Sequence, residues 1–189
     1  SGPIPQAVLD TLGEANSGHT LGYGADVLMD EVRQRIRDLF EAPEAAVYLV
    51  ATGTAANALA LATLVECYDA VFCTPMAHIE EDECNAPEFY TGGAKLTLTH
   101  GADRMTVADL TQAIESQGNR GVHGPRRGAV SITQVTEMGN VYTLEHLRTL
   151  CDTAKSYDLP IHLDGARFAN AVVSLGCSCA DMSWKAGVD

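Results

Sequence analysis

Short apolar runs alternate with longer segments of helical periodicity through most of the chain. The apolar runs occupy residues 45–51, 70–74, 95–100, 129–134 and 160–163. Helical patterns cover residues 5–15, 26–41, 52–68, 106–118, 143–158 and 166–176, and residues 16–26 form a glycine-rich loop. Parallel strands need long crossovers, usually helices, and are apolar along most of their length. The alternation therefore predicts an α/β fold with a mostly parallel sheet and helices on both faces.

The charge balance narrows the range of partners. The chain has 25 acidic residues and 12 lysines and arginines, a net charge of -13. A surface of this sign repels nucleic acid and anionic membranes, so we expect neither as a partner. No apolar run approaches the roughly 20 residues that a membrane helix needs. A small molecule or another protein is the expected partner.

The cysteines indicate no metal site. Six are present, at positions 67, 73, 84, 151, 177 and 179. None of them forms the Cys-x-x-Cys spacing of a zinc or redox motif. We expect reduced thiols, no metal and a cytoplasmic protein.

In a parallel α/β sheet, ligands bind beyond the carboxyl ends of the strands, so polar residues at those points are the candidates. The stretch VATGTAANA, residues 50–58, ends a strand and begins a helix. Gly53 permits close backbone approach, and the hydroxyl of Thr54 joins the free N–H groups of the helix start, which favours an anion. Simple helix capping by Thr52 or Thr54 is the alternative. No Gly-Lys-Ser/Thr follows, so this is not a P-loop.

Two further strand ends carry weaker signals. His78 follows the strand at 70–74 and is either a catalytic base, a flat partner for an aromatic ligand or an ordinary surface histidine. The acids that follow it are expected to be mostly a solvated face: Glu80, Glu81, Asp82 and Glu83. After the strand at 129–134, Gln134, Thr136 and Glu137 could line a pocket, but a turn at Met138-Gly139-Asn140 is a sufficient explanation of this stretch, so these residues have low functional weight.

The stretch DLPIHLDGARFANA, residues 158–171, ends a buried strand on a carboxylate. Asp164 needs a cationic partner there. Arg167 is one choice. The other is a protonated ring nitrogen of a cofactor, which would leave Arg167 free to bind a carboxylate with its planar fork. Together, the residues at the strand ends predict a ligand with a phosphate, an aromatic ring and a basic ring nitrogen. Pyridoxal 5'-phosphate has all three.

Four stretches, in this order, carry a resemblance to a known family: GYGADVLMDE, VATGTAAN, AHIEEDE and HLDGAR. The chain resembles the low-specificity L-threonine aldolases, pyridoxal-phosphate enzymes of the aspartate-aminotransferase-like fold, in the group that includes the β-eliminating lyases. The resemblance implies a pyridoxal-phosphate-dependent transferase-like large domain, incomplete at both ends. Residues 1–25 would be an N-terminal helix with the glycine-rich loop, and residues 26–189 an incomplete cofactor-binding domain without the C-terminal small domain.

The resemblance also implies roles for individual residues. Gly53 and Thr54 match the phosphate-binding turn. His78 matches the histidine that stacks on the pyridine ring near the substrate β-hydroxyl, and Asp164 matches the acid at the ring nitrogen. Arg167 matches the arginine at the cofactor and the substrate carboxylate, and we expect His78, Asp164 and Arg167 to be catalytic.

Tyr23 lies in the loop that approaches an active site near a subunit interface in this family, so it is an expected substrate-binding residue. The resemblance implies a homodimer or homotetramer. The implied reaction is cleavage of a threonine-like β-hydroxy-α-amino acid to glycine and an aldehyde, with the amino group held on the cofactor as a Schiff base. A β-eliminating lyase, or another pyridoxal-phosphate enzyme of amino acid metabolism, is the alternative.

One departure concerns the lysine that forms the Schiff base in this family. The only lysines here, Lys95, Lys155 and Lys185, do not match its motif. We therefore expect the chain to be an internal fragment of a longer polypeptide, without normal turnover by itself. A non-catalytic scaffold that keeps the fold without this lysine is the other explanation.

Overall fold

A parallel sheet organises the molecule, whose computed structural model describes residues 3–118 and 120–189. The strands of this described part are β1 (Asp69–Cys73), β2 (Lys95–Leu98), β3 (Arg126–Thr133) and β4 (Ile161–Asp164). They lie in the order β2-β1-β3-β4, and each neighbouring pair is parallel. The predicted fold class is confirmed, and four of the five predicted strands form.

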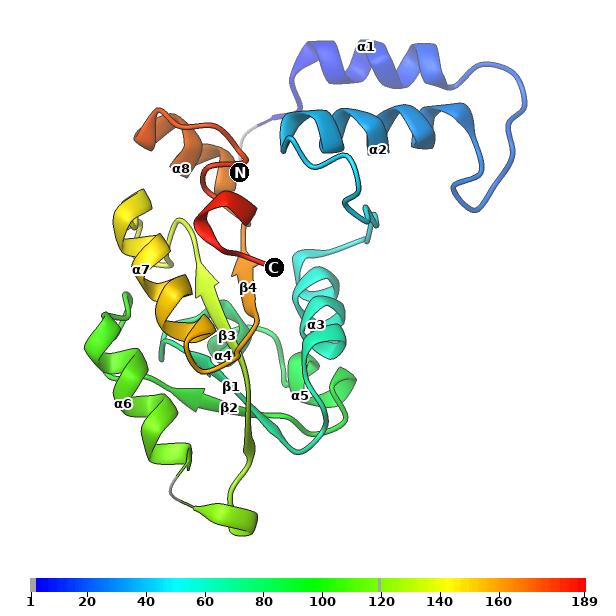
Figure 1. The fold of residues 1–189 in the computed structure, drawn as a ribbon. Coiled ribbons are helices and arrows are strands. Elements are labelled where there is room, and N and C mark those ends of the chain that lie inside the picture. Colours follow the sequence, from blue (N-terminus) through cyan, green and yellow to red (C-terminus); the bar gives the residue numbers. More distant parts are fainter. Residues whose placement is uncertain (1–2, 119) are drawn as a thin grey trace.

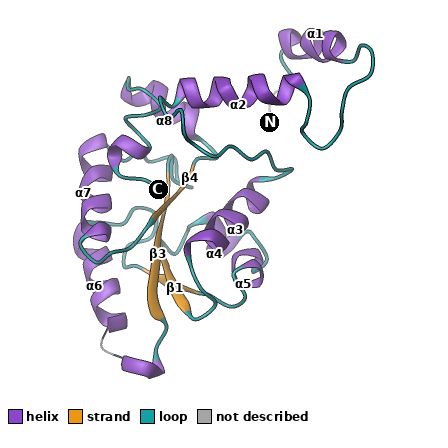
Figure 2. Cartoon of the chain, turned by 45° about the vertical axis from the view of Figure 1, so that its right-hand side comes forward, coloured by secondary structure: helices purple, strands orange, loops and turns teal. Residues whose placement is uncertain are grey.

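Helices cover the sheet on both sides. Helices α6 (Val107–Gly118) and α7 (Leu144–Lys155) lie on one side, and α3 (Gly53–Leu64) and α5 (Ala86–Tyr90) lie on the other (Figures 1 and 2). Short α4 (His78–Glu81) and α8 (Phe168–Leu175) follow the carboxyl ends of β1 and β4, and two 3₁₀ turns span Gly121–His123 and Trp184–Ala186.

The core follows from the period-two alternation of side chains along a strand. In β1, Phe72 belongs to the larger apolar cluster, with Leu110 of α6 and Leu147 of α7. Its neighbour Val71 points to the other face and packs in a second cluster that includes Leu61 of α3. All five side chains are almost fully buried. The strands are therefore apolar on both faces because each face carries its own helix layer.

The prediction of a buried strand at residues 45–51 is wrong. The segment forms no strand, and Tyr48, Leu49 and Val50 are exposed to 84%, 57% and 43%. A strand needs a neighbour to accept and donate its backbone hydrogen bonds. Within the described residues, the sheet consists of the four strands β1, β2, β3 and β4 alone. The segment at 45–51 therefore has no strand beside it with which to pair.

The N-terminal part forms an arm that projects from the sheet. It contains α1 (Gln6–Ala15) and α2 (Val27–Leu39), which lie together at the top of Figure 1. Asp26 caps α2 by accepting a hydrogen bond from the backbone N–H of Met29 at 3.0 Å. Neither helix has a buried residue.

The arm is joined to the rest of the molecule at its C-terminal end. The indole Nε1 of Trp184 donates to the carbonyl of Phe40 at 2.7 Å, and Lys185 pairs with Glu41 at 2.7 Å. The ring of Phe40 lies 5.3 Å from that of Phe168.

Among the described helices, none is both long and apolar enough to cross a membrane. The six cysteines are free thiols.

Candidate active site

The carboxyl ends of the strands and the start of α3 enclose a small cavity of about 110 Å³. Its lining comes from α3, α4, the end of β4 and the chain that follows α4 and β4: Gly53, Asn57, His78, Glu83, Asp164, Ala166 and Arg167. A second cavity of about 710 Å³ extends between α3 and β4 and shares Gly53, Asn57, Asp164 and Ala166 with the first. Four of the residues singled out from the sequence thus meet at one place: His78, Asp164 and Arg167 come from parallel strand ends, and Gly53 comes from the start of α3.

The start of α3 leaves backbone donors available. Thr52 caps the helix, because its Oγ1 accepts from the N–H of Ala55 at 3.1 Å. Capping by Thr52 is confirmed, but it uses neither the N–H of Gly53 nor that of Thr54, which directly follow it. A Cβ built on Gly53 would meet no heavy atom within 4 Å, so the space beside this helix start is open. An open, positively polarised helix start suits an anion.

Asp164 ends β4 and is 7% exposed. The register of the sheet places it beside Thr133, the last residue of β3. Its Oδ1 accepts from the N–H of Ala166 at 2.9 Å, and its Oδ2 accepts from Nδ2 of Asn57 at 3.0 Å. Both bonds are to neutral donors, so the carboxylate is held in position at the cavity without a direct cationic partner among the described residues.

Arg167 is held by other groups than Asp164. Its Nε donates to the carbonyl of Val135 at 3.0 Å, and its Nη2 donates to Oε1 of Glu137 at 3.3 Å. The simple explanation in which Asp164 and Arg167 only neutralise each other is therefore wrong. The guanidinium faces the cavity next to an acid that does not come from β4.

His78 begins α4 with its side chain 41% exposed. Its Nδ1 lies 2.9 Å from Oε1 of Glu83, and its backbone N–H donates to Oε1 of Glu137 at 3.3 Å. The hydrogen bond to Glu83 raises the pKa of His78 above its ordinary value, against the opposing effect of partial burial. His78 is thus not a lone surface histidine but a member of a hydrogen-bonded group.

Two members of this group were not predicted from the sequence, and a third had low weight. Asn57 lies four residues after Gly53, so it shares that face of α3, and this spacing was the available signal. Glu83 was expected on a solvated face with its three neighbours, but it is 3% exposed. Glu137, which had low weight, bridges His78 and Arg167, and its Oε2 is buried without a hydrogen-bond partner among the described residues.

The other polar residues after β3 have structural contacts. Gln134 closes its loop through both side-chain ends, donating to the carbonyl and accepting from the N–H of Tyr142. Thr136 donates to Asp103 at 2.7 Å. Gly139 has a φ of 82°, as expected for the turn after Met138.

Tyr23 lies away from this cavity within one chain. It belongs to the arm, its side chain is fully exposed, and it lines another cavity of about 390 Å³ with residues that include Gly24, Arg33 and Tyr48. The proposed role of Tyr23 at a subunit interface stays a prediction.

None of the three lysines, all of which the structure describes, lines the cavity. Lys95 begins β2, Lys155 ends α7, and Lys185 is paired with Glu41. Among the described residues, no group of three or more His, Cys, Asp and Glu side chains is arranged to bind a metal ion.

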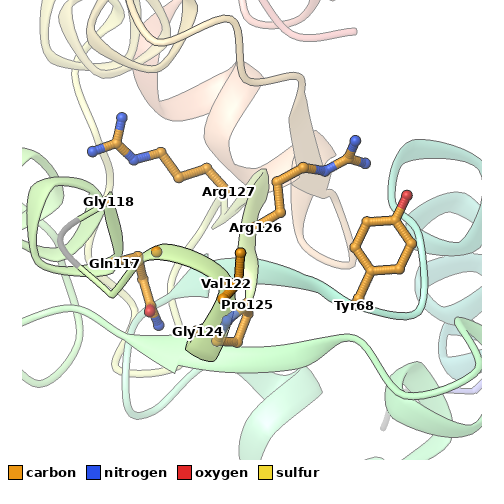
Figure 3. Close-up of a pocket in the computed structure, with 9 residues that line it drawn as sticks. Tyr68, Gln117, Gly118, Val122, Gly124, Pro125, Arg126 and Arg127 are labelled. Atoms are coloured by element: carbon orange, nitrogen blue, oxygen red, sulfur yellow. The ribbon is translucent and has the colours of Figure 1, made fainter.

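A third cavity of about 550 Å³ lies at the opposite end of the strands, where β3 begins. Figure 3 shows Arg126 and Arg127 there, pointing to opposite sides of the strand. Arg126 binds both carboxylate oxygens of Asp69 at 2.7 and 2.9 Å and lies 5.0 Å from the ring of Tyr68. Arg127 donates to the carbonyl of Ile114 at 2.8 Å. Both guanidinium groups have partners, so the charge at this edge serves the fold.

Known structures share this architecture. A threonine aldolase from Leishmania major superposes with a TM-score of 0.89 and 30% identity, over 96% of this chain and 53% of that chain. A serine palmitoyltransferase from S. paucimobilis with a bound PLP–myriocin aldimine superposes with a TM-score of 0.53 at 19% identity, a likeness of fold alone. The fold and the position of the site define the class of pyridoxal-phosphate-dependent transferase-like proteins.

The family is narrower than this class. Residues 2–189 match the beta-eliminating lyase family, and the chain belongs to it. It is 43% identical to the low specificity L-threonine aldolase of Pseudomonas aeruginosa, over 100% of this chain and 54% of that protein. It is 27% identical to the low specificity L-threonine aldolase of Escherichia coli, over 94% of this chain and 52% of that protein. The chain spans about half the length of the curated relatives it matches.

Proposed function

We propose that the full-length protein cleaves a threonine-like β-hydroxy-α-amino acid to glycine and an aldehyde, with pyridoxal 5'-phosphate as cofactor. One observation carries the proposal: the buried Asp164 faces the same cavity as the open helix start at Gly53, with His78 and Arg167 beside it. The named relatives, both threonine aldolases, support the same reaction.

The residues of the cavity, together with Thr54 next to Gly53 at the start of α3, fit this cofactor. The N–H groups of Gly53 and Thr54, with the hydroxyl of Thr54, suit its phosphate. Asp164 suits a protonated ring nitrogen, since its present partners are neutral. Buried oxygens without a partner among the described residues, Oε2 of Glu83 and Oε2 of Glu137, add to the demand for a cationic or hydrogen-bonding ligand.

Each side chain then has a task in the reaction. Pyridoxal phosphate, when bound, supplies an electron sink for the bond between Cα and Cβ. Asp164 would hold the proton on the ring nitrogen, and a protonated ring withdraws electrons from the substrate more strongly. Arg167 binds the substrate carboxylate and so orients the bond that breaks. His78 accepts the proton of the β-hydroxyl, directly or through a water molecule.

The direct test is product analysis. Full-length protein, supplied with the cofactor, is incubated with threonine and other β-hydroxy amino acids, and glycine and aldehyde are measured. Formation of both in equal amounts is expected. Absence of both products with every substrate rejects the proposed reaction. An absorption band of the bound cofactor that shifts on addition of glycine tests the cofactor separately.

Elimination is the second candidate, because the matching family is that of the beta-eliminating lyases. The same Asp164, Arg167 and helix start would serve it, since they act on the cofactor and the carboxylate and not on the leaving group. Release of pyruvate and ammonia, in place of glycine and an aldehyde, decides for elimination.

We also propose a cytoplasmic homodimer or homotetramer in which Tyr23 contributes to a substrate site of a neighbouring subunit. The arm that carries Tyr23 has no buried residue in the single chain, which supports burial against another subunit. Mixed oligomers of a Tyr23→Ala and an Asp164→Asn subunit test this. Partial recovery of activity on mixing is expected, and no recovery argues against a shared site.

A further inference from the structure

Glu83 is buried in a way that sequence position alone does not explain. It follows three exposed acids, yet its side chain has no exposed surface. A carboxylate is rarely buried unless its oxygens have partners. Oε1 of Glu83 accepts from Nδ2 of Asn57 at 2.8 Å and lies 2.9 Å from Nδ1 of His78. Two side chains of the cavity therefore meet at one buried oxygen.

The backbone around Glu83 holds it in place. Ile79 and Ala77 anchor α4 with 3% exposure each. The N–H of Asp82 donates to the carbonyl of His78 at 2.9 Å, and that of Ala86 donates to the carbonyl of Glu83 at 2.9 Å. His78 and Glu83 thus lie at the two ends of one short, anchored segment, so their contact is set by the backbone and not by a chance rotamer.

Asn57 ties this pair to the carboxylate at the end of β4. Its single Nδ2 donates to Glu83 and also to Oδ2 of Asp164 at 3.0 Å. Asn57 is 6% exposed, so neither bond competes freely with water. One amide therefore fixes two acids at the distance that its two N–H bonds allow.

We propose that Glu83 is a positioning residue that fixes the ring of His78 with its proton on Nδ1, so that Nε2 is the atom presented to the ligand, and that Asn57 holds Glu83 for this task. The inference rests on the proposed function, because that function assigns His78 to the ligand. A partner on one ring nitrogen selects the tautomer and the orientation of an imidazole. No hydrogen bond within the described residues uses Nε2 of His78.

The charges that face His78 come from several elements. Glu83 and Asp82 lie on its own segment, Asp164 lies at the end of β4, and Glu137 accepts from its backbone N–H. Arg167, which pairs with Glu137, is the nearby cation. Glu83, Asp164 and Asp82 raise the pKa of His78, with the hydrogen bond to Glu83 as the largest cause. Because Glu83 supplies this hydrogen bond, removal of Glu83 should change the pKa of His78 more than removal of any other of these acids.

The test is a titration of His78 by ¹⁵N-edited NMR in the full-length holoenzyme, with His78→Gln used to assign the signals. We expect the Nδ1–H tautomer in the unchanged protein. Glu83→Gln removes the negative charge at nearly constant size, and the pKa of His78 should fall. In Glu83→Ala the preference for the Nδ1–H tautomer should disappear. Glu81→Gln, an exposed charge on the same helix, is the matched control and should change neither property.

Kinetics give a second, independent result. In Glu83→Gln we expect kcat to fall by roughly 10- to 100-fold with a smaller change in KM, because a correctly held base contributes about 10²–10⁴-fold and the ring is still present. The acid limb of the pH profile should move to lower pH with the pKa of His78. Glu83→Asp, which keeps the charge on a shorter stem, should recover part of kcat.

An unchanged pKa of His78 in folded Glu83→Gln overturns the proposal. If Glu83→Ala does not fold, the Glu83→Gln titration still decides. The NMR result does not depend on the reaction: an unchanged protein that makes neither glycine nor aldehyde rejects the proposed aldolase activity while the titration still tests Glu83.

Discussion

The arm and the sheet region differ in how far they bury their apolar side chains. Every residue that the structure describes as buried lies at or beyond Asn57, whereas α1 and α2 contain none. The arm nevertheless exposes many large apolar side chains, among them Ile4, Val8, Leu9, Leu12, Leu21, Val27, Leu28 and Leu39. Both regions have helical periodicity, but only the sheet region has an internal surface against which to bury it.

The difference shows that the core and the candidate site belong to the same region of the chain. The sheet region encloses its own core and carries the cavity with Asp164. The arm is joined to it through a few contacts at Phe40 and Glu41. Since most helix stability in proteins comes from tertiary packing, the arm should open more readily than the sheet region.

The largest effect should come from a cavity in the core. Phe72→Ala removes a fully buried ring of β1 and should lower the free energy of unfolding by about 3–5 kcal/mol. In the dissociated single chain, the matched change in the arm, Leu12→Ala at a 58% exposed site, should change it by less than about 0.5 kcal/mol. Urea unfolding measures both. Similar losses at the two sites would show that the arm is packed as tightly as the core.

The next effect concerns the site. Asp164→Asn in the full-length protein should lower turnover by roughly 10²–10³-fold, because a preorganised charge at the reacting group is lost. Asp30→Asn, an acid of the arm whose side chain is 79% exposed, should leave turnover unchanged. Glycine formation is measured, with circular dichroism as the check on folding. Full turnover in Asp164→Asn would contradict the role of this acid.

A pH-dependent effect should separate the ion pairs of the two regions. Burial would raise the pKa of Asp69, but the hydrogen bonds from Arg126 and from the N–H of Glu66 hold it below its usual value. A lowered folded pKa stabilises the protein above the unfolded value of 3.8, and this contribution is lost as the pH falls through the folded value.

Asp69→Asn should therefore cost roughly 1–3 kcal/mol at neutral pH, and the difference from the unchanged protein should shrink in acid. The exposed pair Arg33–Asp30 of the arm gives the comparison, since Asp30→Asn should have little effect at any pH. Urea midpoints across pH measure this. A difference for Asp69→Asn that does not vary with pH would argue against the ion pair as its source.

The smallest effect should stay within the arm. Asp26→Ala removes the cap of α2 and should destabilise that helix by about 1 kcal/mol. Hydrogen exchange of α2 amides should become faster while the amides of β1 and β3 keep their rates. If exchange accelerates across the sheet as well, the arm and the sheet open as one unit.

The helices could be predicted from the sequence because their signal is local. The 3.6-residue period, the cap at Asp26 and the cap at Thr52 lie within one segment each. The same local signals led to the wrong prediction of a strand at residues 45–51. Its apolar pattern is typical of a strand, but a strand also depends on a neighbour that the pattern itself does not contain.

The site shows the same division. Asp164, Arg167 and His78 follow from their places at or after strand ends, because parallel topology gathers those places at one end of the sheet. Gly53 was placed after a strand that does not form, and it reaches the cavity as the first residue of α3. Glu83 could not be distinguished from its acidic neighbours, since burial of one residue in a charged run depends on how α4 sits over the sheet. The partner of Arg167 was likewise a matter of tertiary structure.

The parallel arrangement also bears on the order in which the molecule forms. In the described sheet, no two neighbouring strands are joined by a hairpin, so each pairing must close a long loop, as for Asp69 and Arg126, which are 57 residues apart. The side chains of Asn57 and Asp164 are 107 residues apart. Closing such distant contacts slows folding, because chain entropy is lost before the contacts form. The bond between Asn57 and Asp164 also joins distant parts of the chain, so a competent cofactor pocket should appear late in folding and serve as a kinetic marker of its progress.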